Sequence, residues 1–144
     1  MAPTVRAYPI YTVISEKLQA LTVLGMANSR MKDYYDLWTF ATHAEIRGSI
    51  LVTAIRTTFE RRETPIPTEI PMGLTVEFAE DEEKIRQWNA FTEKIETDPR
   101  NPALDKAVDV LRAFLYPALG AARSSGDEFD KLWQPGGPWV RPLD

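Results

Sequence analysis

The sequence contains no cysteine and a single histidine, His43, among its 144 residues. The absence of cysteine excludes disulfide bonds and thiolate metal ligands, and a single histidine excludes a multi-histidine metal centre within one chain. A bound metal would have to be a hard cation held by carboxylates. No run approaches 18 apolar residues, and the first residues lack the apolar stretch of a secretory signal. We therefore expect a cytoplasmic protein without a membrane-spanning segment.

Positive and negative charges are unevenly distributed along the chain. Residues 1–62 carry eight Lys and Arg against five Asp and Glu, whereas residues 63–144 carry nine against sixteen. The first part could face phosphate groups while the acidic second part favours solubility. Its small positive excess is nevertheless far below that of a typical nucleic-acid-binding domain, so charge alone is weak evidence for such a partner.

The spacing of apolar residues predicts a mainly α-helical fold. With 44% hydrophobic residues, the chain is long enough for one domain with a single core. We expect about five helices, over residues 11–24, 30–42, 45–61, 80–96 and from Asn101 onward. In one domain of residues 1–144, basic helices (7–62) would precede a proline-rich connector (63–79), an acidic helical pair (80–123) and a loop-like tail (124–144).

Prolines mark several expected breaks in this pattern. The residue before Pro9 is disfavoured in a helix, so residues 7–10 should be extended. Pro117 should kink or end the last helix. Apolar residues alternate over 74–78, which fits either a short strand or a two-turn helix.

One lysine needs a specific explanation. Lys17 lies near the middle of an apolar stripe on the first predicted helix, formed by Ile10, Val13, Ile14, Leu18, Leu21 and Leu24. A partly desolvated ammonium needs a carboxylate, a phosphate or a route to water. Sixteen residues later, Asp33 and Asp36 are three residues apart and should share one face of the second helix.

Two interpretations of these charged residues are open. In the ordinary one, Asp33 complements the helix N-terminus, Lys32 and Asp36 form a surface pair, and Lys17 extends into solvent. In the functional one, Lys17 and Asp33 flank a nucleotide site. The lysine would neutralise phosphate oxygens, and the aspartate would hold a divalent cation or accept the proton of an attacking hydroxyl.

The arginines of the first half allow two interpretations as well. Arg47, Arg56, Arg61 and Arg62 could contact an RNA backbone. They are interspersed with glutamates, however, as on an ordinary solvated helix face.

The same region resembles a known family. The segments YPIYTVISEKLQAL (8–21) and GMANSRMKDYYDLW (25–38) are similar to the C-terminal half of the AbiEii/AbiGii nucleotidyltransferase toxins. These toxins belong to type IV toxin–antitoxin and abortive infection (phage defence) systems. In that family a helix containing Glu-Lys-Leu precedes the motif Arg-x-Lys-Asp-x-x-Asp-Leu. The stretches TFERR (58–62) and GGPW (136–139) are also similar.

The resemblance implies roles for individual residues. It implies that Lys17 and Asp33 are catalytic, and that four neighbours support the site or bind nucleotide: Glu16, Arg30, Lys32 and Asp36. It further implies a nucleoside triphosphate as substrate, Mg²⁺ as cofactor and, as in some members, transfer RNA as acceptor.

One family feature is absent. The N-terminal half of these toxins carries two metal-binding aspartates spaced one residue apart, and this sequence has no Asp-x-Asp. We therefore expect no metal site within the chain alone, and no activity without an N-terminal nucleotidyltransferase half. The alternatives are a non-catalytic helical module that binds an antitoxin or another protein through exposed aromatic residues, or a truncated product without activity. Exposed apolar surface could also lead to a homo-oligomer.

Overall fold

The computed structural model describes residues 2–95, 101–124 and 129–142. Over these residues the chain is mainly α-helical, as the sequence predicts, and none of the helices is long and apolar enough to cross a membrane. The helices are α1 (Ala2–Leu24), α2 (Met31–His43), α3 (Gly48–Arg61), α4 (Val76–Glu80), α5 (Glu82–Lys94) and α6 (Leu104–Arg123). Two 3₁₀ turns, η1 (Gly25–Ala27) and η2 (Met72–Leu74), and three short strands, β1 (Ile46–Arg47), β2 (Leu132–Trp133) and β3 (Trp139–Val140), complete the fold.

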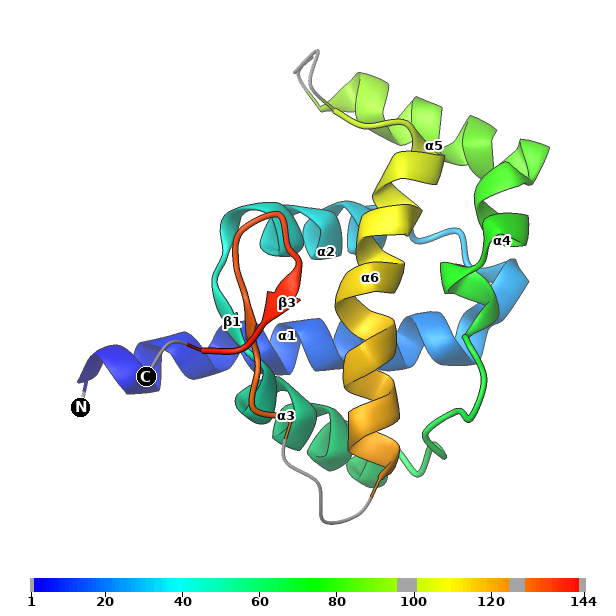
Figure 1. Ribbon diagram of the computed structural model, residues 1–144. Helices are drawn as coiled ribbons and strands as arrows, with labels where there is room; N and C mark the ends of the chain where they lie inside the picture. The colour runs from blue at the N-terminus through cyan, green and yellow to red at the C-terminus, as the bar shows by residue number, and fades with distance from the viewer. Residues whose placement is uncertain (1, 96–100, 125–128, 143–144) are drawn as a thin grey trace.

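The helices pack around one connected core. Helix α1 packs along α3, and α6 packs against both α2 and α3 (Figure 1). The most buried large side chains come from these four helices and also from α4, α5 and β2: Trp88, Trp133, Tyr34, Phe59, Phe78, Phe114, Ile14, Leu18 and Leu37. Helix α1 also contacts α2, so the charged residues near the start of α2 lie close to a helix that α3 holds in place.

Helix α1 differs from the prediction in two respects. It begins at Ala2, so the extended conformation expected for residues 7–10 is wrong; the helix continues past Pro9, which removes only one backbone hydrogen bond. In addition, Val13 is exposed while Tyr11 and Leu18 are buried. Lys17 thus lies at the edge of the buried face of α1, from which its ammonium can reach both protein and solvent.

Ser15 on the buried face of α1 provides a test of this packing. Its side chain is fully buried and its hydroxyl has no hydrogen-bond partner. Because an unpaired buried hydroxyl is unfavourable, Ser15→Ala should raise the free energy of unfolding by about 1 kcal/mol, measured by urea unfolding. Thr22→Ala is the control, because the Thr22 hydroxyl donates a hydrogen bond to the Leu18 carbonyl. A destabilised Ser15→Ala variant would contradict the packing described for this face.

Helix α6 continues past its proline. The sequence predicts a kink or an end at Pro117, but the helix extends to Arg123. Its last turn is buried through Ala118, Leu119 and Ala122. The guanidinium of Arg56 donates hydrogen bonds to carbonyls at its C-terminus, those of Ala121, Ala122 and Ser124. These tertiary contacts offset the hydrogen bond that the proline cannot make.

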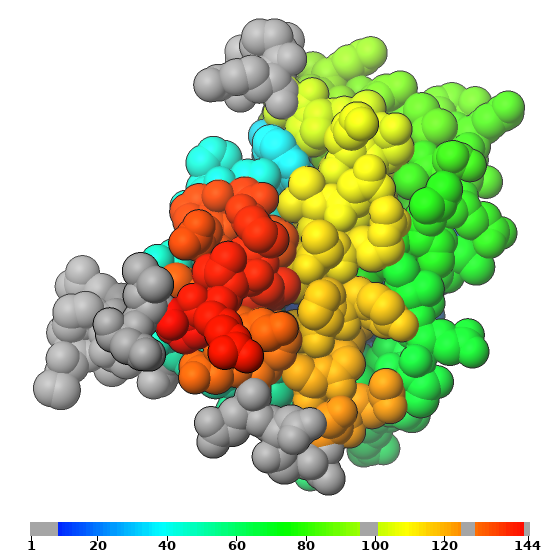
Figure 2. Space-filling view, in the orientation of Figure 1, coloured from blue at the N-terminus to red at the C-terminus, as the bar shows by residue number. Residues whose placement is uncertain are grey.

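The tail is not loop-like throughout. Strand β2 pairs antiparallel with both β1 and β3, in the order β1-β2-β3. The pairing of Ile46 and Arg47 with β2 also explains why α3 begins at Gly48 and not at residue 45 as predicted. The segment 129–142 lies on the surface beside α6 (Figure 2).

A tryptophan anchors this tail to the body. The ring of Trp133 is buried and packs 4.8 Å from Phe114 of α6, and its indole nitrogen donates a hydrogen bond to the Ala41 carbonyl of α2. Gly137, within the GGPW stretch, has φ +81°, and a Cβ atom there would lie 2.5 Å from the Trp133 ring. This turn therefore requires glycine.

The segment between α3 and α6 agrees with the prediction more closely. Residues 74–78 adopt the helical alternative, as the end of η2 and the start of α4. The hydroxyl of Thr75 accepts a hydrogen bond from the Phe78 amide, and the carboxylate of Asp81 accepts one from the Lys84 amide. These two caps fix α4 and α5 within a residue or two of their predicted positions. The start predicted at Asn101 is wrong, since α6 begins at Leu104.

Candidate functional site

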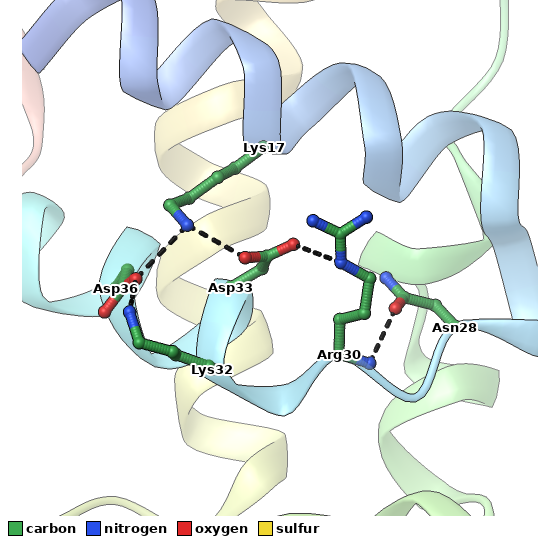
Figure 3. A network of polar contacts seen from close by, with 6 residues as sticks. All are labelled: Lys17, Asn28, Arg30, Lys32, Asp33 and Asp36. Atoms are coloured by element: carbon green, nitrogen blue, oxygen red, sulfur yellow. Dashed lines mark hydrogen bonds and ion pairs between the residues drawn. The ribbon is translucent and has the colours of Figure 1, made fainter. Parts of the chain in front are cut away.

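Lys17 and Asp33 are in direct contact. The ammonium of Lys17 donates a hydrogen bond to Oδ1 of Asp33 at 2.8 Å and lies 3.2 Å from Oδ2 of Asp36 (Figure 3). The Lys17 side chain is 19% exposed and that of Asp33 is 9% exposed. Asp33 and Asp36 share one face of α2, as the sequence predicts, and both carboxylates reach the same ammonium.

Arg30 extends this network toward the start of α2. Its Nε lies 2.9 Å from Oδ2 of Asp33, an ion pair whose geometry is not that of a hydrogen bond, so Oδ2 is a buried oxygen without a hydrogen-bond donor. The backbone amide of Arg30 donates to the side-chain oxygen of Asn28, which is buried. The Asn28 side chain therefore stabilises the turn just before α2, and the N-cap residue of the helix itself is Arg30. Asp33 thus lies between two cations that come from different elements.

The other two supporting residues have different partners. Lys32, with a side chain 72% exposed, pairs with Asp36 at 2.8 Å, so this element of the ordinary interpretation is present. Glu16 does not contact Lys17's partners. It forms ion pairs with Arg61 and Arg62 at the end of α3, and thereby ties α1 to α3.

A groove runs beside this network. It has a volume of about 360 Å³ and is lined by Thr12, Val13, Glu16, Lys17, Gln19, Ala20, Arg30 and Arg62. Three cations, one from α1 and two from the ends of α2 and α3, therefore line one groove, together with the apolar side chains of Val13 and Ala20. Arg62 is the member that the sequence did not assign to this site; it was considered only as a possible RNA contact, and its position at the end of α3 gave no sign that it would lie near Lys17. Asp33 stands behind the groove, in contact with two of its cations.

A second groove lies between α1 and α3. Its volume is about 520 Å³, and hydroxyl-bearing residues dominate its wall: Tyr11, Thr12, Ser49, Thr53, Thr57 and Thr58. It contains one cation, Arg61, and neither Lys17 nor Asp33 lines it. The smaller groove is the better candidate site, because three cations line it and two of them, Lys17 and Arg30, contact the buried carboxylate of Asp33.

The environment shifts the titration of two groups around Asp33. Partial burial lowers the pKa of Lys17, but the hydrogen bonds and charges of Asp33 and Asp36 together raise it by more, so the pKa lies above its ordinary value. Burial raises the pKa of the Tyr34 hydroxyl, which donates a hydrogen bond to the Gly73 carbonyl at 2.9 Å. Lys17 is therefore a permanent cation at neutral pH and not a general base.

These shifts predict a loss of stability in alkali. A group whose pKa is raised on folding stabilises the fold fully below its unfolded pKa, and this contribution is lost as pH rises through the folded pKa. The free energy of unfolding should therefore fall above about pH 10, the range of unfolded Tyr and Lys. Urea unfolding from about pH 8 to 11 measures this. Lys17→Met and Tyr34→Phe should each reduce the slope, and a pH-independent wild type would contradict the assignment.

The remaining sequence candidates have structural partners. Arg56 donates hydrogen bonds to the end of α6, and Arg61 and Arg62 pair with Glu16, so three of the four arginines considered for RNA binding have partners within the fold. Arg62 also lines the groove beside Lys17. Within the described parts of the chain, no group of three or more His, Cys, Asp or Glu residues could hold a metal ion.

Comparison with known proteins gives one match. A family model described as "Nucleotidyl transferase AbiEii toxin, Type IV TA system" matches residues 1–110. Searches of curated proteins and of solved structures find no match. The matched range contains α1, α2 and α3, and with them every residue that lines the Lys17 groove. The chain therefore belongs to the AbiEii nucleotidyltransferase toxin family.

Proposed function

We propose that this chain supplies the lysine and aspartate side of a nucleotide site in a nucleotidyltransferase toxin, with a nucleoside triphosphate as substrate and Mg²⁺ as cofactor. One observation carries the proposal: Lys17, held by the buried carboxylate of Asp33, borders a groove that Arg30 and Arg62 also line. The groove is lined by these three cations and by one carboxylate, that of Glu16, which pairs with Arg62. The excess of positive charge suits a polyphosphate chain.

The chemistry assigns different tasks to these residues. In nucleotidyl transfer, the oxygen of an acceptor hydroxyl attacks the α-phosphorus, the bond to the pyrophosphate oxygen breaks, and the hydroxyl proton leaves. Lys17 would contact a phosphate oxygen and stabilise the negative charge that develops there. Asp33 would hold Lys17 and Arg30 toward the groove. The hydroxyl proton would pass to solvent water, because Oδ2 of Asp33 is buried and ion-paired with Arg30.

The metal ligands are proposed to come from outside this set of residues. Asp33 and Asp36 are already paired with cations, so the residues present do not form a magnesium site by themselves. Magnesium ions in such reactions neutralise the charge of the triphosphate. We infer that acidic ligands of the Asp-x-Asp type complete the site, and that this sequence alone does not catalyse transfer.

The proposed partners follow from the family. A nucleotidyltransferase half that carries the missing aspartates, an antitoxin and a transfer RNA acceptor are all proposed on that basis. The alternative of a binding module that uses exposed aromatic residues has little support. Among the described large apolar residues that are exposed, only Tyr116 is aromatic; the others are Val13, Val23, Met72, Val76 and Ile85.

Reconstitution tests the proposal. The chain is combined with a nucleotidyltransferase segment that carries Asp-x-Asp, with Mg²⁺, labelled nucleoside triphosphates and an RNA acceptor. Lys17→Ala should reduce labelling by at least about 100-fold, since it removes a charge that stabilises the transition state. Lys106→Ala, an exposed lysine on α6, is the matched control and should have no effect. Unchanged labelling with Lys17→Ala would remove Lys17 from the site.

A further inference from the structure

A second lysine is buried in this fold, away from the groove. Lys84 of α5 is only 5% exposed, and its ammonium donates a hydrogen bond of 2.7 Å to the backbone carbonyl of Asn28. The same ammonium lies 5.5 Å from the centre of the Phe78 ring. It takes part in none of the ion pairs formed among the described residues.

The charge of Lys84 is not explained by packing alone. Burying an ammonium without a carboxylate is costly, and a methionine of similar length could fill the same space without that cost. The ammonium does have a task that methionine cannot perform. It donates a hydrogen bond to the carbonyl of Asn28, the residue that follows η1 and begins the turn before α2. This turn comes shortly after Gly25, which has φ +56°.

That turn is directly coupled to the groove. Asn28 accepts the Lys84 hydrogen bond through its backbone carbonyl, and its side-chain oxygen accepts the Arg30 amide at 2.8 Å. Arg30 in turn contacts Asp33, which holds Lys17. Figure 3 shows the part of this chain of contacts from Asn28 to Lys17.

A second route reaches the same carboxylate. The Phe78 ring, beneath the Lys84 ammonium, stacks on Tyr34 with centroids 5.1 Å apart and planes 15° apart. Tyr34 is the residue after Asp33 on α2. Lys84 thus contacts two groups, the Asn28 carbonyl and the Phe78 ring, that are linked to residues before and after Asp33.

We propose that Lys84 is a positioning residue: its buried ammonium fixes the turn at Asn28 and so sets where Arg30 and Asp33 stand relative to Lys17. Lys84 does not line the groove and does not contact a ligand there. The inference rests on the proposed function only for its effect on phosphate binding. The effect on the geometry of Arg30 and Lys17 is independent of any ligand.

Nitrogen-15 NMR of the folded chain tests the proposal without ligand. Lys84→Met should shift the signals of Arg30 Nε and Lys17 Nζ, and Lys84→Arg should restore them, since a guanidinium can donate to the same carbonyl. Lys94→Met, an exposed lysine on the same helix, is the control. Unchanged Arg30 and Lys17 signals in folded Lys84→Met would overturn the proposal. If that variant does not fold, Lys84→Gln, which keeps a neutral donor but is too short to reach the Asn28 carbonyl in the same way, must shift both signals, and unchanged signals in it would overturn the proposal equally.

Titration with inorganic triphosphate separates this inference from the proposed function. Lys84→Met should bind triphosphate on the order of tenfold more weakly than the wild type, the effect typical of residues that orient a site. Shifted NMR signals with no triphosphate binding by the wild type would count against the proposed function and support the role of Lys84. Equal triphosphate binding by wild type and Lys84→Met with unchanged signals would overturn the role of Lys84 and leave the groove as a phosphate site.

Discussion

Asp33→Ala is expected to lower the free energy of unfolding by about 3 kcal/mol, because removal of one partner from a buried ion pair leaves the other without compensation. The Asp33 carboxylate is 91% buried and contacts Lys17 and Arg30, which come from different segments. Without it, Lys17 keeps only the longer contact to Asp36 at 3.2 Å. Urea unfolding at pH 7 measures the change.

The neighbouring aspartate provides the control for this prediction. Asp36 is 25% exposed, and Lys17 would keep its shorter contact to Asp33 in its absence. Asp36→Ala should therefore cost no more than about 1 kcal/mol, as for an exposed ion pair. Equal effects of the two substitutions, or a change within about 0.5 kcal/mol for Asp33→Ala, would mean that the Lys17–Asp33 contact does not organise this part of the fold.

Trp133→Ala should have the largest effect on stability, about 4 kcal/mol, as is typical of a buried aromatic side chain. The ring of Trp133 lies 4.8 Å from Phe114 and 5.5 Å from Trp139, and its hydrogen bond to Ala41 is buried. The substitution leaves a cavity at the point where the tail meets α2 and α6. Thermal or urea unfolding gives the size of the effect.

Two further variants make this second prediction specific. Trp133→Phe keeps much of the ring and loses the hydrogen bond, so it should cost about 1 to 2 kcal/mol. Tyr116→Ala removes an exposed aromatic from α6 and should stay within about 0.5 kcal/mol of wild type. If Trp133→Ala were as mild as Tyr116→Ala, segment 129–142 would not be anchored to the body as described.

The helices could be predicted from sequence where their signals are local. The apolar spacing of α2 and α3 and the acidic start of α5 placed these elements within a few residues. The extended segment predicted before Pro9 and a helix end at Pro117 do not occur, because a local preference is outweighed: α6 gains buried contacts and the Arg56 hydrogen bonds beyond its proline. Strands of two residues carry too little pattern to be recognised, and β2 pairs with β1 across more than 80 residues.

The candidate site was predictable in part for a similar reason. A lysine among apolar residues needs a partner, which singled out Lys17, and the family resemblance placed Lys17 and Asp33 in one site; the structure brings the two side chains into contact. Arg62 and Lys84 join the site through contacts 46 and 56 residues apart in sequence, to Glu16 and Asn28. Contacts between residues this far apart cannot be inferred from one sequence, so the places of Arg62 and Lys84 beside the site are evident only from the structure.

The most direct test of the central claim follows the Lys17 ammonium while a nucleoside triphosphate with Mg²⁺ is added to this chain. We expect weak, saturable shifts of the nitrogen-15 signals of Lys17, Arg30 and Arg62, with a dissociation constant on the order of 1 mM, and loss of the Arg30 and Arg62 shifts in Lys17→Ala. Signals that do not move, or shifts of Arg30 and Arg62 that Lys17→Ala leaves unchanged, would contradict the central claim.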